Sequence, residues 1–97
     1  MPYEIQFVSS ARRQLRGFSA SERTRVVDSI DVQLSHEPEV ETRNRKRLRQ
    51  NPIAPWELRI QNIRVFYEVE QVGKVTILAI GKKRGNRLYI EGQEIQL

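Results

Sequence analysis

The chain has 97 residues, enough for a small domain with one modest hydrophobic core, and we expect residues 1–97 to form a single domain. It contains no cysteine and one histidine, which excludes disulfides, thiolate nucleophiles and sulfur-dependent zinc sites, so neither a metal nor another cofactor is expected. A formal charge of +5 favours phosphates or an acidic partner as ligands, and the lack of a long apolar stretch or a secretory leader predicts a cytoplasmic protein.

A first strand and a short helix are expected at the N-terminus. Residues 3–8 alternate between apolar and polar side chains, as a strand with one buried face does. Ser9 or Ser10 would cap the helix that follows, and Gly17 would lie near its end. The apolar residues of this helix fall at helical spacing: Ala11, Leu15 and Phe18.

A capping box predicts the start of a second helix. The Ser19 hydroxyl can accept a hydrogen bond from an early helical amide while Glu22 reaches back to the cap. Pro38 prevents the helix from continuing. The apolar face would consist of Val26, Val27, Ile30 and Leu34. Two helices joined so closely predict a helical hairpin.

The segment from residue 39 to residue 51 is polar and then strongly basic, which predicts a connection that touches the core at Leu48. Pro52 and Pro55 keep the chain extended as it approaches Trp56.

The clearest pattern in the chain spans residues 56–70 and predicts a β-hairpin. Leu58 and Ile60 form a short apolar run, and Gln61-Asn62 is a candidate tight turn because asparagine tolerates positive φ. The second strand would direct Ile63, Val65, Tyr67 and Val69 to one side, with Arg64, Phe66, Glu68 and Glu70 on the other.

A third strand of the same meander is expected after a turn near residues 72–74. Residues 75–80 are apolar except for Thr76, which is typical of an interior strand covered on both faces, and the strand would end at Gly81. Residues 87–97 alternate loosely and predict a strand, a tail or part of a partner interface.

The order strand, helix, helix and then a three-stranded antiparallel meander predicts an α+β domain. Two helices would pack on one face of a small antiparallel or mixed sheet. The opposite face would be free for function, and Arg64 would lie there on a rigid strand.

Nine of the seventeen basic residues fall in two short runs. A charged run is usually a solvated face, and that interpretation applies to both runs here. The alternative is contact with RNA or the ribosome, because flexible cations bind phosphates in a salt-dependent manner. The runs are Arg43, Arg45, Lys46, Arg47 and Arg49, followed by Lys82, Lys83, Arg84 and Arg87.

The chain resembles the toxins of the RelE/ParE superfamily of bacterial toxin–antitoxin modules. The resemblance covers nearly the whole sequence and is specific in combination, whereas each piece alone is weak. It rests on the segments YEIQF, ARRQL, KRLRQNPIAPWELRI, IRVFYEV and ILAIGKKRGNRLYI. It implies the RelE-like fold, a cognate antitoxin protein as partner and, in the RelE-like branch, binding of the ribosome and mRNA.

The RelE-like branch implies an mRNA endoribonuclease that cuts in the ribosomal A site without a metal and so inhibits translation. The ribose 2′-hydroxyl attacks the adjacent phosphate, and basic side chains stabilise the charge that develops. Arg64 matches the strand arginine at the reacting phosphate, and Lys83, or Arg84 in a shifted register, matches the basic residue after the last strand. Tyr89 matches a C-terminal tyrosine that stacks on a base or orients the substrate.

Two departures from the branch favour other interpretations. Glu57 stands where some RelE-like nucleases carry lysine, and His36 is not at a position that would supply a catalytic imidazole, so no general base is evident. One alternative is a ParE-like inhibitor that binds DNA gyrase; another is an inactive, partner-binding relative.

Structural roles are alternatives for individual residues. Arg64 could pair across the hairpin with Glu57 or Glu68. Tyr67 is expected in the core and Trp56 as a packing anchor at the sheet edge, whereas Tyr89 fits either the edge of the core or the site.

Overall fold

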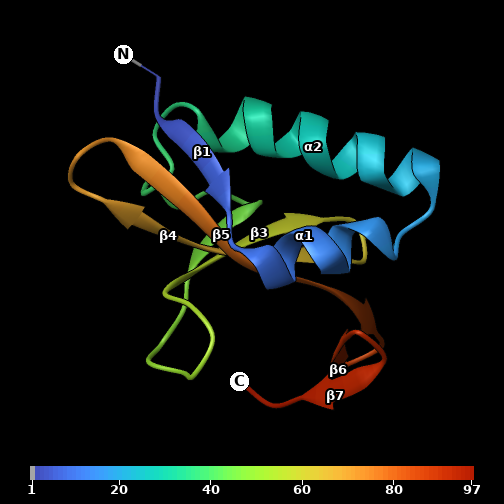
Figure 1. Ribbon diagram of the computed structural model, residues 1–97. Helices are drawn as coiled ribbons and strands as arrows, with labels where there is room; N and C mark the ends of the chain where they lie inside the picture. The colour runs from blue at the N-terminus through green and yellow to red at the C-terminus, as the bar shows by residue number, and fades with distance from the viewer. Residues whose placement is uncertain (1) are drawn as a thin grey trace.

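The computed structural model describes residues 2–97, which fold into two helices packed against a seven-stranded sheet (Figure 1). The helices are α1 (Ser9–Arg16) and α2 (Ala20–Leu34). The strands are β1 (Glu4–Phe7), β2 (Arg45–Arg47), β3 (Trp56–Ile60), β4 (Ile63–Glu70), β5 (Lys74–Arg84), β6 (Arg87–Ile90) and β7 (Gln93–Ile95). The predicted α+β architecture, with both helices on one face of the sheet, is confirmed.

β5 is the strand to which most of the sheet is attached. The order is β2-β3-β4-β5-β6-β7, with every neighbouring pair antiparallel, so the predicted meander is β3-β4-β5. β1 is parallel to β5 and occupies the same edge as β6, further back along β5. The sheet is therefore mixed, with β1 paired directly with β5 and the C-terminal β7 joined to β5 through β6.

The first helix begins at a different kind of cap from the one predicted. Val8 is its N-cap, and no side chain forms a capping hydrogen bond there, so the prediction of a Ser9 or Ser10 cap is wrong. The Val8 amide donates to the Ile77 carbonyl of β5, while the Val8 carbonyl accepts from Arg12. The β1–β5 pairing thus fixes the point at which the strand turns into the helix.

The second helix begins at the predicted capping box. The Ser19 hydroxyl accepts from the Glu22 amide at 3.2 Å, and the Glu22 carboxylate accepts from the Ser19 amide at 3.0 Å. One member of the predicted apolar face is wrong: Val27 is 47% exposed. It lies one residue from Val26 and therefore points about 100° away from the buried stripe.

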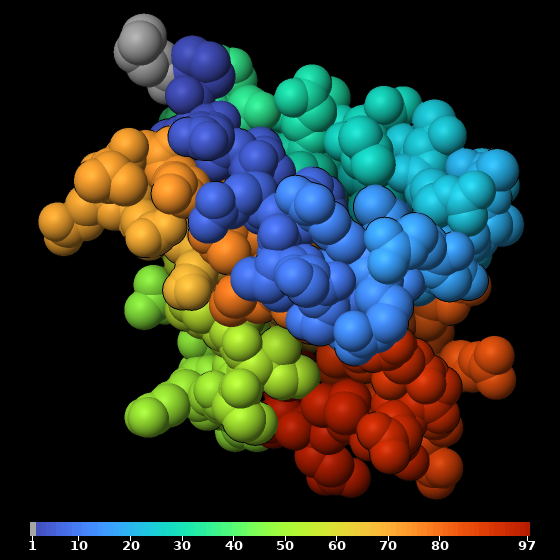
Figure 2. Space-filling view, in the orientation of Figure 1, coloured from blue at the N-terminus to red at the C-terminus, as the bar shows by residue number. Residues whose placement is uncertain are grey.

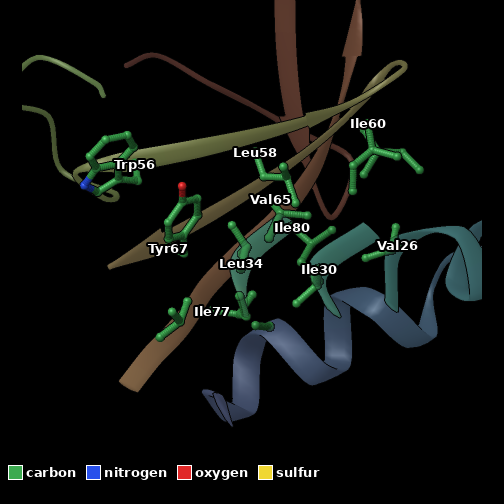
Figure 3. Close-up of a cluster of buried hydrophobic side chains, with 13 residues drawn as sticks. Val26, Ile30, Leu34, Trp56, Leu58, Ile60, Val65, Tyr67, Ile77 and Ile80 are labelled. Atoms are coloured by element: carbon green, nitrogen blue, oxygen red, sulfur yellow. The ribbon is translucent and has the colours of Figure 1, made fainter. Parts of the chain in front are cut away.

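The main hydrophobic core lies between the helices and the sheet (Figure 3). Leu34, Leu58, Val65 and Tyr67 are fully buried in it. The Trp56 and Tyr67 rings stack with centroids 6.0 Å apart, and the Tyr67 hydroxyl donates to the Pro38 carbonyl at 2.7 Å. Burial raises the pKa of this hydroxyl. The packing roles predicted for Trp56 and Tyr67 are confirmed, but Trp56 is not at the sheet edge, because β2 pairs with β3 there.

The β3–β4 hairpin has the predicted two-residue turn, but a different residue carries the positive φ. Gln61 has φ of 55°, whereas Asn62 was expected to tolerate that conformation. The segment before β3 also contains a strand that was not predicted: β2 pairs with the edge of β3 through Arg45 to Arg47. Three consecutive basic residues carry no alternation that would identify them as a strand.

The C-terminal part is more ordered than expected. β5 continues through Gly81 to Arg84, so the predicted end at Gly81 is wrong. A β-carbon on Gly81 would lie 2.6 Å from the Tyr89 carbonyl oxygen, which means that glycine allows the close approach of β6. Residues 87–97, predicted as a strand, a tail or an interface, contain the β6–β7 hairpin.

The face away from the helices is only partly open, in contrast to the expectation of a free face. Residues 48–54 and the β6–β7 hairpin cover Phe66 and Ala79 there and form a second apolar cluster with Leu88. Leu48 packs on this cluster, as its predicted core contact implies. Figure 2 shows the green segment before β3 meeting the red C-terminal hairpin below α1. The uncovered part of the face lies toward the β3–β4 turn.

Candidate functional site

The uncovered part of the sheet carries charged side chains from three adjacent strands. Arg59 of β3 is the direct neighbour of Arg64 of β4, and Arg64 is the neighbour of Gly81 of β5. Glu57 and Lys83 each lie two residues from a member of this row, so they share its face. We call Glu57, Arg59, Arg64 and Lys83 the basic face.

Arg64 is held against the hairpin turn. Its Nη1 atom donates to the Gln61 carbonyl at 2.6 Å and to the Ile63 carbonyl at 3.0 Å. Burial lowers the pKa of the guanidinium; the Glu57 carboxylate opposes this shift, and the Arg59 cation adds to it. An arginine stays charged under such a perturbation, so Arg64 presents a fixed, half-desolvated cation.

Glu57 pairs with Arg59 and not with Arg64. Arg59 Nε lies 2.8 Å from Glu57 Oε2, and the Glu57 side chain is only 8% exposed. Within residues 2–97, the guanidinium of Arg64 donates to backbone carbonyls, and neither Glu57 nor Glu68 forms an ion pair with it. The expected cross-hairpin pair is therefore replaced by a pair within β3.

Alternation along β5 separates the three basic residues at its end. Lys83 lies on the basic face, and its amide donates to the Asn62 carbonyl at 2.7 Å. Lys82 lies on the helix side, where its Nζ is 2.8 Å from Glu22 Oε2 and 5.2 Å from the centre of the Phe18 ring. Arg84 shares that side, with its guanidinium 5.8 Å from the centre of the Tyr89 ring.

The four predicted catalytic residues therefore do not form one constellation. Arg64 and Lys83 share the basic face, whereas Arg84 and Tyr89 line a cleft of about 530 Å³ between α1 and the end of β5. Arg13 and Glu91 also line this cleft and form an ion pair of 2.9 Å between Arg13 Nε and Glu91 Oε2. A pleated strand sends successive side chains to opposite faces, so Lys83 and Arg84 cannot act from the same side.

Two solved structures contain chains with this fold. One is a chain of the RelBE2 toxin–antitoxin complex of Mycobacterium tuberculosis, with a TM-score of 0.73 and 27% identity over 86% of this chain and 93% of that chain. The chain has the fold of a RelE-like toxin, as its sequence resemblance implied. The other is a chain of the archaeal RelE–RelB complex of Pyrococcus horikoshii OT3, with a TM-score of 0.69 and 22% identity over 88% of this chain and 98% of that chain. No protein-family model matches the sequence, and no curated protein matches it.

The basic run before β3 of this RelE-like chain has mixed roles. The Arg45 guanidinium is engaged internally, because it donates to the Gln33 carbonyl at 2.8 Å and to the Val40 carbonyl at 2.9 Å. Arg47 lies 5.6 Å from the centre of the Trp56 ring. The other two arginines of the run, Arg43 and Arg49, are exposed. β3 and β4 separate this run from the basic end of β5.

The two remaining residues that were predicted to bind RNA or the ribosome differ in exposure. Lys46 is half-buried on β2, opposite Glu57. Arg87 is exposed at the start of β6, with its Nη1 3.9 Å from Glu94 Oε1, a distance at which the two charges barely pair. Lys46 therefore lies beside the basic face, whereas the Arg87 guanidinium is available to bind an external anion.

Two kinds of feature are absent from the described residues. Among residues 2–97, no group of three or more histidine and acidic side chains is arranged to hold a metal ion. No helix in the same range is long and apolar enough to span a bilayer.

Sequence reasoning missed Arg59. The RelE-like chain has a cation at this position, two residues beyond the glutamate that was singled out as a departure. The signal was present: a two-residue turn after Ile60 makes Arg59 and Arg64 direct neighbours on one face.

Proposed function

We propose that this chain is the toxin of a toxin–antitoxin pair and that it cuts mRNA on the ribosome, which inhibits translation. The observation that carries the proposal is the basic face, where Arg59, Arg64 and Lys83 come from three adjacent strands of a rigid sheet. Fold similarity to chains of two toxin–antitoxin complexes supports the toxin role. A cytoplasmic location follows from a ribosomal target.

RNA cleavage by 2′-hydroxyl attack increases the negative charge on a crowded phosphate. Fixed cations stabilise this charge without reorganising, and their effect is strong at a half-desolvated site. Arg64 is held by two backbone carbonyls, so its guanidinium is oriented before RNA binds. We assign phosphate stabilisation to Arg64 and Lys83, with Arg59 beside them. Arg84 and Tyr89, in the cleft on the other side, would contact flanking nucleotides.

Other exposed cations would bind ribosomal RNA. Phosphates of the ribosome would be bound, outside the reaction itself, by Arg43, Arg49 and Arg87. Further positive charge would come from cations that already have neighbours within the chain, namely Lys46, Arg47 and Lys82. Such contacts are salt-dependent and insensitive to sequence. Arg45 is a structural residue in this scheme, since its guanidinium is used within the chain.

The antitoxin would neutralise the protein by covering the basic face. A segment that is acidic or amphipathic matches the net charge of +5 and the apolar cluster beside the face. The purified complex should therefore be less basic and less active than the free chain. A complex as basic and as active as the free chain would contradict this mode of neutralisation.

Primer extension on a defined message in a purified translation system tests the nuclease proposal. We expect cuts within codons that require ribosomes, and a loss of about 100-fold or more in Arg64→Ala because one fixed donor to the developing charge is removed. Arg12→Ala is the matched control, since it removes the same charge from an exposed position on α1. An uncut message, or equal cutting by Arg64→Ala, would reject the proposal.

A further inference from the structure

The basic face contains one acidic side chain in an unusual position. Glu57 lies in the middle of β3, and its side chain is 8% exposed. A carboxylate is rarely buried to this extent unless it is paired. One of its oxygens, Oε2, accepts from Arg59 Nε at 2.8 Å. The carboxylate is therefore held in one orientation by a residue of its own strand.

The second oxygen of Glu57 has no partner within the described part of the protein. Among residues 2–97, no donor is hydrogen-bonded to Oε1. No buried side-chain oxygen or nitrogen in that part of the chain lacks a partner either. Oε1 is therefore accessible to water, and its lone pairs are available beside the cations of the basic face.

The neighbours of Glu57 cannot replace it as a proton acceptor. The basic groups around it are Arg59 on the same strand, Arg64 on β4 and Lys46 on β2. Arginine and charged lysine carry donors and no acceptor. The next carboxylate along that face of β4 is Glu68, beyond the buried Phe66. Within the basic face itself, Glu57 alone can take a proton.

We propose that Glu57 is the general base of the cleavage reaction, an inference that rests on the nuclease proposed above. Oε1 takes the proton of the ribose 2′-hydroxyl while the 2′-oxygen forms a bond to phosphorus. The bond from phosphorus to the 5′-oxygen breaks with its electron pair, and that oxygen takes a proton from water. The products are a 2′,3′-cyclic phosphate and a 5′-hydroxyl, and the hydroxide recovers the proton from Glu57.

The role of Arg59 follows from this assignment. Arg59 is a positioning residue, because it binds Oε2 and leaves Oε1 without a partner among the described residues. Arg64 and Lys83 neutralise the phosphate that the 2′-oxygen attacks. The buried glutamate of β3 therefore supplies the proton acceptor that the surrounding cations lack.

Single-turnover cleavage of a ribosome-bound message by Glu57→Gln tests the assignment. Glutamine preserves the shape and can still accept from Arg59, but it cannot serve as the base. We expect the cleavage rate to fall by about 100-fold to 10,000-fold, while ribosome binding and the thermal unfolding midpoint stay unchanged. Glu68→Gln, which removes the same charge from β4, should cut at the unaltered rate.

The dependence of the rate on pH separates a base from a structural residue. In the unaltered protein the rate should fall as the medium becomes acidic, because a protonated carboxyl accepts no proton. The residual rate of Glu57→Gln should lack this fall. Glu57→Asp keeps a carboxylate on a shorter chain, and we expect it to cut faster than Glu57→Gln.

The outcomes distinguish the two proposals. If the unaltered protein cuts in an Arg64-dependent manner and Glu57→Gln cuts equally fast, Glu57 is not the base and the nuclease proposal stands. If Glu57→Gln cuts more slowly but its rate still falls at acidic pH, the assignment of Glu57 as the general base is also rejected. If the unaltered protein does not cut ribosome-bound mRNA, both proposals are overturned.

Discussion

The side-chain oxygen of Gln14 accepts a hydrogen bond from the Ile80 amide at 2.8 Å. Ile80 lies in a gap on the edge of β5, between the β1 pairing, which reaches Ile77, and the β6 pairing, which starts at Lys82. Gln14 is buried on α1 and fills this gap with an acceptor. A helix side chain thereby continues the hydrogen bonding of the sheet where no strand is available.

Gln14→Ala should lower the free energy of unfolding by about 1–3 kcal/mol, because it leaves the buried Ile80 amide without an acceptor. Urea denaturation measures the loss. Gln71→Ala, in the exposed turn before β5, is the control and should change stability by less than about 0.5 kcal/mol. Equal stability of the two variants would show that water satisfies the Ile80 amide instead.

Glu22 should make stability depend on pH in the acidic range. Its hydrogen bonds to Lys82 and to the Ser19 amide lower the pKa of the carboxyl from 4.5 to about 2. Because the pKa is lower in the folded state, the ionised Glu22 stabilises the folded protein at pH values above the ordinary pKa of 4.5. This stabilisation is lost as the pH falls from 4.5 toward about 2. The stability difference between the unaltered protein and Glu22→Gln should shrink across that interval. A difference that stays constant there would contradict the assignment.

Gly81→Ala should disturb the junction of β5 and β6. The added β-carbon would lie 2.6 Å from the Tyr89 carbonyl oxygen and 2.8 Å from Ile90 Cγ1, so the backbone has to move. We expect a loss of about 1–3 kcal/mol and faster amide hydrogen exchange in β6. Gly17→Ala is the control, since its nearest contact would be an ordinary 3.4 Å. Unchanged exchange in β6 would reject this role of Gly81.

The elements predicted correctly are those specified by neighbouring residues. The capping box needs only Ser19 and Glu22, and the β3–β4 hairpin follows from alternation on both sides of a two-residue turn. Both signals are local, so they can be detected without knowing which distant segments pair with these elements. The serine cap of α1 failed for the opposite reason, because a contact with distant Ile77 determines where that helix begins.

The elements that were missed depend on pairing partners. β2 is three basic residues long and is a strand only because β3 offers a free edge. The extension of β5 beyond Gly81 depends on β6, which lies on the other side of the turn after Arg84. Gly81 itself suggested an end, since glycine weakens a strand interior, whereas here it marks the approach of another backbone.

The candidate site was predicted in part. Arg64 was correctly assigned to the face away from the helices, because alternation with Ile63 and Val65 determines it. The β5 strand was predicted to end at Gly81, so the sequence did not determine on which side of the sheet Lys83 and Arg84 lie. The observed β5 separates them, and the same alternation brings Arg59 and Glu57 beside Arg64.

The pairing of the N-terminal strand β1 with β5 also determines when the protein can fold. Gln6 of β1 donates to Thr76, a residue 70 positions later, so the first strand has no partner until β5 has been synthesised. Contacts at such separation form late, and a growing chain leaves the ribosome with its N-terminus first. A chain interrupted before residue 74 has neither a platform for its two helices nor Lys83 for its basic face. An unfinished copy of this protein therefore lacks both the complete sheet and the assembled basic face.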